Sequence, residues 1–341
     1  MKVIKRYIIY SILALATILQ GCVNDEEVED SAIGNFDALW NILNDRYCFF
    51  EYKDVDWNEV YSRYRPQVSE NMNRHELFTL MANMLAELKD GHVNLISNFD
   101  QARYWKWFED YPDNFNADIV DKNYLQEPHD KIAGGMRYRI LENENIGYIY
   151  YGSFSSMVGE NSLDEILYSF SDCKGIIIDV RNNSGGSLDM VDRLVARFID
   201  KDLTAGYIRH KLSPEHNHFS EYYPITITPV NESRIKYRGK VAVLTNRMCY
   251  STTNQFVSAM NQLPNVAIIG DKTGGGSGLP FSSVLPNGWS VRFSSSPIVN
   301  PQKEEIEFGI EPTIKAEMGD YSTSSTSDNI INTAINWINN Q

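Results

Sequence analysis

The chain has 341 residues, of which 43% are hydrophobic and 22% are charged, and its formal net charge at pH 7 is −14. This length allows one large domain or two modest ones, and the composition excludes collagen-like, disordered and multi-span membrane proteins. A surface this acidic is repelled by nucleic acid and by anionic lipid, so we expect neither as a binding partner.

The first 22 residues have the pattern of a secretory signal. Three cations stand among the first six residues, residues 7–19 are uncharged and mostly apolar, and Gly21 and Cys22 close the segment. The apolar stretch is short for a bilayer span, so residues 1–21 are predicted to be a cleaved signal peptide. A cysteine directly after a glycine resembles a bacterial lipobox, which implies that Cys22 is lipidated. An ordinary signal peptide with an incidental cysteine is the alternative.

The mature chain would then begin with a lipidated cysteine and an acidic tether, residues 22–32. Removal of the signal takes away three cations and no acids, so the remaining chain is more acidic still. We therefore expect an exported bacterial lipoprotein at the outer membrane, on its periplasmic or surface face. Only the lipid, and not the protein surface, would attach it to the membrane.

Residues 33–98 are predicted to form a small helical N-terminal domain. Two sets of apolar residues recur at helical spacing: Phe36, Leu39, Trp40 and Leu43, and then Leu77, Leu80, Met81, Met84, Leu85 and Leu88. The second stripe ends at Lys89-Asp90-Gly91, a cation followed by a helix-stopping turn. Residues 92–96 are predicted to form a short strand.

The remainder of the chain is predicted to be a connecting segment, an α/β core and a tail. Residues 99–140 show no sustained period and are too few for an added PDZ domain, whereas residues 141–320 alternate between strands and helices. Strands are predicted at 146–151, 175–180, 241–245 and 266–269, and helices at 163–170, 191–198 and 253–263. This order is typical of an α/β fold with parallel pairing. Residues 321–341 are predicted to form a Ser/Thr-rich segment and a C-terminal helix.

The spacing of cysteines and histidines indicates neither a disulfide framework nor a metal site. Outside the signal, Cys48, Cys173 and Cys249 lie in or beside apolar runs, and their odd number predicts buried free thiols. His216-Asn-His218 lies in a polar loop without a third ligand. We therefore expect no metal and no cofactor.

Three loops follow predicted parallel strands, where ligands commonly bind. Residues 179–186 end in Gly185 and Gly186, whose N–H groups could face an oxyanion; a tight turn is the alternative. Ser251 stands before a predicted helix and could be an ordinary N-cap. The same position aims the N–H of Thr252 and the helix dipole at the serine oxygen, as a nucleophile needs. Residues 270–278 contain five glycines and could form the rim of a peptide site.

A serine nucleophile needs a base, and His92 is the most distinctive of the six histidines. It follows a glycine turn and opens a predicted strand, which would hold its ring rigidly. A lone histidine with a structural role is the alternative.

Five segments in this order resemble motifs of the tail-specific, or C-terminal processing, serine proteases. They are 90–93 (DGHV), 177–186 (IIDVRNNSGG), 243–246 (VLTN) with Ser251 behind it, 269–275 (IGDKTGG) and 308–312 (FGIEP). Each motif is weak alone, but five in sequence are specific. The resemblance extends from about residue 85 to about residue 315 and implies a ClpP/crotonase-like α/β core.

The family has two catalytic styles, and the resemblance favours the second. The first is a Ser–Lys dyad, with the lysine about 25 residues beyond the serine. The matching position in this sequence is Gly276, so that lysine is absent, and Lys272 comes four residues too early. The second resembles the tricorn core protease, in which a histidine of the Asp-Gly-His region is the base, and His92 matches it. The resemblance therefore implies Ser251 as nucleophile and His92 as general base.

Further site residues are expected around this pair. The N–H of Thr252 and that of Gly185 or Gly186 would form the oxyanion hole. Tricorn-like enzymes have a glutamate near the closing motif as the third catalytic member, which implies a glutamate that orients His92. Glu307 is preferred over Glu305 for this role because it lies next to the Phe-Gly-Ile segment. Asn254 stands where the family often has glutamate, and it is expected, with Asp90, to support the site, although an amide supplies no negative charge.

We therefore expect a serine endopeptidase that hydrolyses peptide or protein substrates through an acyl-enzyme. The alternative is a non-catalytic protein that binds peptides or apolar ligands on the same scaffold, which Asn254 and the missing lysine motivate. Acyl transfer on a thioester is disfavoured, because the sequence has no basic cluster for a nucleotide phosphate tail.

Overall fold

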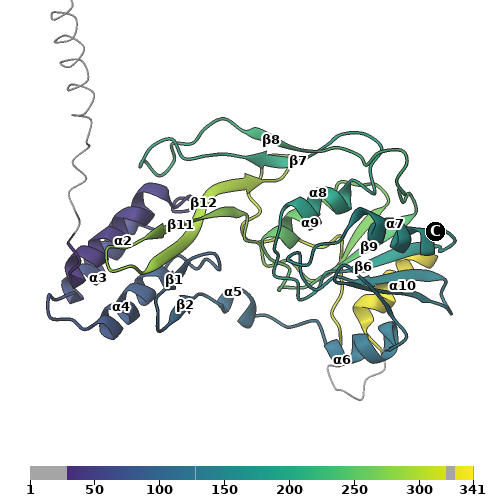
Figure 1. Ribbon diagram of the computed structural model, residues 1–341, viewed down its shortest axis with the longest axis horizontal. Coiled ribbons are helices and arrows are strands. Elements are labelled where there is room, and N and C mark those ends of the chain that lie inside the picture. The colour runs from purple at the N-terminus through teal and green to yellow at the C-terminus, as the bar shows by residue number, and fades with distance from the viewer. Residues whose placement is uncertain (1–28, 127, 320–326, 341) are drawn as a thin grey trace, which may run out of the picture.

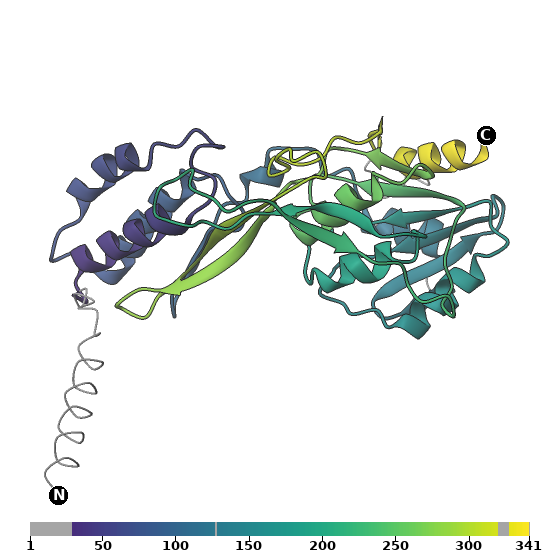
Figure 2. The same ribbon diagram turned by 90° about the horizontal axis from the view of Figure 1, so that it is seen from above.

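The computed structural model describes residues 29–126, 128–319 and 327–340. The predicted signal peptide, Cys22, most of the acidic tether and most of the Ser/Thr-rich segment lie outside these residues. Within the described ranges, no helix has both the length and the apolar character that a membrane crossing requires. Figures 1 and 2 show an elongated molecule with a helical lobe at one end and an α/β lobe at the other.

The α/β lobe is built on a seven-stranded sheet. Its spatial order is β13 (Ile314–Lys315), β10 (Val266–Gly270), β9 (Lys240–Thr245), β6 (Gly175–Asp179), β5 (Ile146–Tyr150), β4 (Met136–Leu141) and β3 (Lys131–Ala133). The strands from β13 to β5 pair in parallel, whereas β4 and β3 add an antiparallel edge. The predicted parallel α/β core is therefore confirmed.

Helices cover both faces of this sheet, because the central strands are apolar on both sides. One face packs against α7 (Glu160–Ser169), α8 (Asp189–Val195) and α9 (Thr252–Met260). The other packs against α6 (Ala117–Ile119), the π-helix η2 (Val120–Leu125) and α10 (Asn329–Asn339). Along β6, Ile176 and Ile178 belong to the first core and Ile177 to the second, as the alternation of a strand requires.

The helical lobe packs around the two predicted apolar stripes. It contains α2 (Ala32–Arg46), α3 (Trp57–Tyr64), the 3₁₀ turn η1 (Arg65–Gln67) and α4 (Arg74–Ala86), followed by the short α5 (Lys106–Glu109). Its buried core includes Leu39, Leu43, Met81 and Leu85. Asn73 and Glu76 form a reciprocal capping box, which explains where α4 begins.

A second sheet joins the two lobes. Its order is β2 (Gln101–Arg103), β1 (Asn94–Ile96), β12 (Ser290–Val299), β7 (Leu203–Ile208) and β8 (Tyr223–Ile227), with β11 (Gly278–Val284) paired to β12. Val291 of β12 lies opposite Leu95 of β1, and Val291 and Phe293 pack in the core of the helical lobe. The segment that follows the glycine-rich loop thus completes the lobe that contains α2, α4 and β1.

Two details differ from what the sequence predicts. The segment predicted to connect the two parts ends in the edge strand β3 and the start of β4, which belong to the main sheet; neither strand has an apolar run, because each buries only part of its residues. All three predicted thiols are free, but Cys173 is only partly buried, while Cys48 and Cys249 are buried.

Candidate active site

Ser251 occupies the N-cap position of α9 but does not cap the helix. Its backbone has a positive φ of 58° with ψ −119°, and its side chain makes no capping hydrogen bond. Such a conformation is uncommon for a residue other than glycine, and strained backbone of this kind clusters at functional sites. The Ser251 N–H donates to the carbonyl of Gly275 at 2.8 Å, which ties this turn to the glycine-rich loop.

The hydroxyl of Ser251 instead meets His92. The Ser251 Oγ lies 3.0 Å from Nε2 of His92, although the two residues are 159 positions apart. The structure thus brings the predicted nucleophile and the predicted base within hydrogen-bond reach. His92 comes from the turn after α4, in the helical lobe, whereas Ser251 comes from the α/β lobe.

The ring of His92 is buried and neutral. Burial lowers the pKa of His92 to about 4, although the negative charge of Asp90 acts in the opposite direction. The backbone N–H of His92 donates to Oδ1 of Asp90 at 2.8 Å, and the ring lies 5.0 Å from the ring of Tyr250. A neutral imidazole can accept the serine proton on Nε2 when its own proton sits on Nδ1. Nδ1 is buried and has no hydrogen-bond partner among the described residues.

Behind the ring lies a buried ionic cluster of Lys53, Asp90 and Glu307, which we call the Lys53 cluster. Lys53 Nζ is 2.8 Å from Glu307 Oε1 and 3.5 Å from Asp90 Oδ2. Asp90 Oδ2 also accepts hydrogen bonds from the hydroxyls of Tyr47 and Ser294, each at 2.9 Å. Burial alone would raise the pKa of Asp90, but Lys53 and His92 bring this pKa below its ordinary value.

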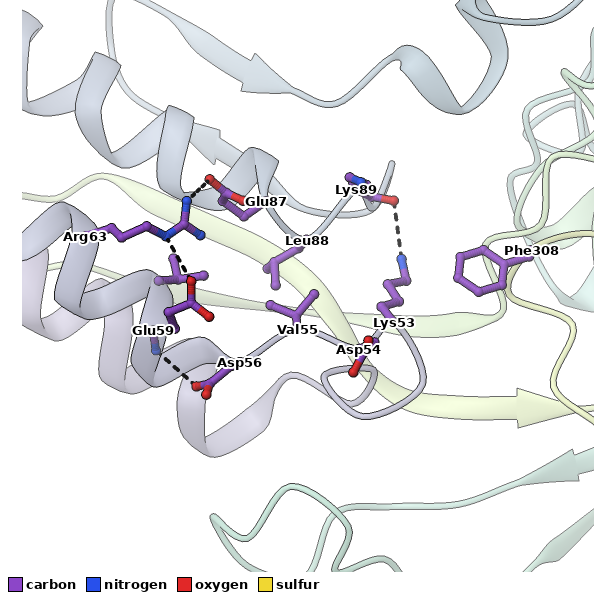
Figure 3. A pocket seen from close by; sticks show the side chains of 11 residues that line it. Lys53, Asp54, Val55, Asp56, Glu59, Arg63, Glu87, Leu88, Lys89 and Phe308 are labelled. Carbon is purple, nitrogen blue, oxygen red and sulfur yellow. Dashed lines mark hydrogen bonds and ion pairs between the residues drawn. The ribbon is translucent and has the colours of Figure 1, made fainter.

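The Lys53 side chain reaches this cluster past the edge of a pocket in the helical lobe. Figure 3 shows its ammonium group directed toward the carbonyl of Lys89, at 3.4 Å, with the ring of Phe308 nearby. The pocket has a volume of about 480 Å³ and is lined mainly by residues of the α2–α3 connection, α3 and the end of α4. Burial lowers the pKa of Lys53, but Asp90 and Glu307 outweigh this effect, so the lysine remains protonated.

The glutamate predicted to orient His92 has other partners. Glu307 is buried, pairs with Lys53, and accepts a hydrogen bond from the N–H of Ser277 at 2.7 Å. Neither Glu307 nor Glu305 bonds to the ring, because Nδ1 of His92 has no partner in the described part of the chain. The expected direct contact is therefore absent from the described part of the chain, where Glu307 is linked to His92 through Lys53 and Asp90.

The backbone around Ser251 contains two N–H groups that could hold an oxyanion. The N–H groups of Thr252 and Gly186 have no acceptor within the described ranges, whereas Gly185 donates its N–H to Asn183 Oδ1 at 3.0 Å. The hydroxyl of Thr252 donates to the carbonyl of Gly186 at 2.8 Å, which holds the glycine loop against α9. Of the two glycines predicted, Gly186 is the one whose donor is free.

Asn254 is buried and holds the loops on either side of the site. Its amide nitrogen donates to the carbonyl of Ile306 at 3.1 Å, and its oxygen accepts a hydrogen bond from the hydroxyl of Thr273 at 2.6 Å. Asn254 thus supports the glycine-rich loop and the closing segment, and these hydrogen bonds do not reach the histidine ring.

The position of the dyad lysine has no room for any side chain. A Cβ atom on Gly276 would lie 2.4 Å from the ring of Tyr250, and φ is +76°. Lys272 pairs with Glu311 at 2.9 Å, at the surface. A Ser–Lys dyad from either residue is therefore excluded by the packing.

The substitution Gly276→Ala is expected to destabilise the protein by more than its strained backbone alone. The matched control is Gly288→Ala, because Gly288 has φ +82° but no atom within 4 Å of an added Cβ. We expect the control to lose about 1–2 kcal/mol of unfolding free energy, because alanine is strained at a positive φ. Gly276→Ala should lose a further 1–3 kcal/mol, roughly, from overpacking against Tyr250. Chemical denaturation of both variants measures this difference, and equal losses would contradict the steric argument.

Several residues of the site have no signal in the sequence. Lys53 lies in the polar stretch Glu51-Tyr52-Lys53-Asp54, which has the composition of a solvated turn. Tyr47 and Ser294 come from segments that give no hint of a shared carboxylate. No group of histidine, cysteine and acidic side chains suited to a metal occurs in the described part of the chain.

Two family models match different parts of the chain. The model of peptidase family S41 matches residues 145–316, and that of the tricorn protease C1 domain matches residues 30–86. The carboxy-terminal processing proteases CtpA and CtpB of Bacillus subtilis are 27% and 24% identical over 187 and 185 residues. These matches cover 54% and 53% of this chain, but only 38% and 36% of the two relatives.

One solved structure is similar to this chain at a higher sequence identity than the two processing proteases. A protein of Parabacteroides merdae ATCC 43184, described as a candidate peptidase, is 50% identical with a TM-score of 0.87. The match covers 91% of this chain and 98% of that one. Because the family model spans just over half of the sequence and includes Ser251, the chain belongs to peptidase family S41.

Proposed function

We propose that the protein is a serine endopeptidase in which Ser251 is the nucleophile and His92 is the general base. The observation that carries this proposal is the 3.0 Å approach of His92 Nε2 to the Ser251 hydroxyl. The helical N-terminal part, residues 33–98, supplies the base, and the α/β core, residues 141–320, supplies the nucleophile. Peptide or protein chains are the substrate class that the family supports.

The proposed reaction follows from the positions of these groups. His92 takes the proton of Ser251 as the oxygen attacks a peptide carbonyl, and the N–H groups of Thr252 and Gly186 hold the oxyanion. His92 then gives the proton to the leaving amine, and water repeats the cycle on the acyl-enzyme. The Lys53 cluster acts as a positioning unit: the carboxylate of Asp90 favours the imidazolium that forms, and Lys53 connects it to Glu307.

The pH dependence should report the buried base. Because only neutral His92 accepts a proton, kcat/KM should rise through an apparent pKa near the value of about 4 and stay level to neutral pH. A histidine with an unperturbed pKa would place this rise of kcat/KM at about pH 6.5. Peptide hydrolysis over a pH series measures the profile, with residual activity at neutral pH as the control for acid unfolding. A limb at or above the ordinary histidine pKa would contradict this account.

A fluorophosphonate probe tests the proposed function directly. The mature chain should become covalently labelled, and peptide mapping should place the adduct on Ser251. Labelling that persists in Ser251→Ala would remove the proposal. A chain that binds peptides but is neither labelled nor able to cut them would be the non-catalytic protein.

We propose as well that the chain is exported and attached to the outer membrane through a lipid on Cys22. Support comes from the basic start, the short apolar stretch and the glycine–cysteine junction of residues 1–22. Metabolic labelling with an alkyne fatty acid should mark the wild type and not Cys22→Ala. Equal labelling of both would contradict the anchor.

A further inference from the structure

A second feature of the site is a pocket beside Ser251 with a volume of about 210 Å³. Its lining includes Ser251 and Gln255 from α9 and its cap, the apolar side chains of Leu279 and Ile298, and Arg292 from β12. Within the described ranges, Arg292 is the one charged side chain that lines it, and no carboxylate does. In a chain with a net charge of −14, this is a local reversal of sign next to the candidate nucleophile.

Arg292 is partly buried and unpaired. Its position on β12 lies between Asn94 of β1 and Ser282 of β11, and its guanidinium has no hydrogen bond or ion pair with any described residue. Two buried arginines elsewhere differ: Arg181 pairs with two aspartates, and Arg197 pairs with a glutamate and an aspartate. Burial lowers the pKa of Arg292, and the charges of Tyr250 and Asp90, which do not contact the guanidinium, offset this only in part. An anion that pairs directly with the guanidinium would compensate the remaining cost of burial.

Gln255 adds a second unused donor to the same pocket. It lies one turn after Ser251, since its N–H donates to the Ser251 carbonyl at 3.1 Å, so the two side chains share a face of α9. The side-chain Nε2 of Gln255 is buried and has no hydrogen-bond acceptor in the described part of the protein. An amide N–H₂ and a guanidinium in one pocket, without acceptors, complement the two oxygens of a carboxylate.

We propose that this pocket binds a carboxylate of the peptide substrate, with Arg292 as the residue that determines this specificity. The carboxylate is that of an acidic side chain close to the scissile bond, and recognition of a free C-terminus instead is an outcome of the test that would contradict this assignment. The proposal deepens, and rests on, the proposed peptidase activity, since it needs a peptide that is cut at Ser251. The aliphatic part of the substrate residue would contact Leu279 and Ile298.

The test compares substrates that differ only in charge. One series of peptides carries Glu or its isostere Gln at each position flanking the cut, and a second carries a free or an amidated C-terminus. For the wild type, kcat/KM should be about ten- to a hundredfold higher for the Glu peptide than for the Gln peptide of the first series, as expected for charge-assisted hydrogen bonds. A preference that occurs only in the second series would contradict the assignment to an acidic side chain.

The variant Arg292→Gln should abolish this preference, and Arg292→Glu should favour a Lys-containing peptide instead. The matched control is Arg103→Gln, because Arg103 is exposed on β2 and does not line the pocket. The ratio within a peptide pair is the readout, because the charge of Arg292 also lowers the pKa of His92 and so affects every substrate alike. Fluorophosphonate labelling of each variant confirms that the site is folded and reactive.

The outcomes separate the two proposals. A wild type that is labelled and cuts peptides, but whose carboxylate-to-neutral ratio is one or is unchanged in Arg292→Gln, overturns the carboxylate pocket alone. A wild type that is neither labelled nor active overturns the proposed function, and the pocket proposal with it.

Discussion

Replacement of Ser251 by alanine is expected to reduce kcat/KM for peptide hydrolysis by roughly four to six orders of magnitude. The reason is that the Ser251 hydroxyl lies 3.0 Å from His92, the proposed base, and alanine leaves no atom to attack the carbonyl. His92→Ala should cause a loss of similar size. Because nucleophile and base act as one unit, the double variant should be about as slow as either single variant.

Two controls make this measurement decisive. Ser251→Gly should be equally inactive but no less stable than Ser251→Ala, because glycine adopts φ 58° without strain. Active-site titration with the fluorophosphonate probe excludes a contaminating protease as the source of residual turnover. Turnover by Ser251→Ala within tenfold of the wild type, or additive losses in the double variant, would end the case for this catalytic pair.

Lys53→Met is expected to destabilise the protein by roughly 3–5 kcal/mol, the typical cost of removing one partner from a buried ion pair. The Lys53 side chain is 4% exposed, and those of Asp90 and Glu307 are 0% and 3% exposed, so solvent cannot replace the lost cation. Urea unfolding at neutral pH measures the loss. Activity should fall as well, because Asp90 contacts both Lys53 and the backbone of His92.

A pH series separates lost charge from lost packing in Lys53→Met. Burial and the nearby Asp90 already raise the pKa of Glu307, and removal of Lys53 raises this pKa further. A carboxyl group with a raised pKa in the folded state binds more protons there than in the unfolded state. The variant should therefore regain stability relative to the wild type as the pH falls through that pKa. In the Lys53→Met background, the second substitution Glu307→Gln should restore part of the stability that Lys53→Met loses at neutral pH.

The matched control is Lys272→Met, which breaks a surface pair. Lys272 is 36% exposed and its partner Glu311 is 71% exposed, so the change should cost less than about 1 kcal/mol. It should also leave hydrolysis intact, since the proposed base is His92 and Lys272 pairs with Glu311 at the surface. Equal destabilisation by the two lysine variants would show that the Lys53 cluster is no more important than a surface pair.

The features that depend on local pattern could be predicted from short stretches of the chain. The apolar residues of β6, the stripe of α4 and the serine at the start of α9 each follow from residues close together in the chain. The order of five short motifs pointed to His92 as the partner of Ser251. These features could be predicted because helical or strand periodicity and helix-start chemistry are visible within a short window.

Which polar groups become buried depends on the assembled fold and on no local pattern in the sequence. Lys53 has the sequence context of an exposed turn, and it becomes a buried cation because Asp90 and Glu307, 37 and 254 positions away, fold around it. Arg292 sits in an alternating strand like any surface arginine until β12 crosses to β1 beside Ser251. Contacts over such separations leave no local period in the chain. Burial, pKa and the choice of hydrogen-bond partner therefore emerge only when the two lobes are assembled.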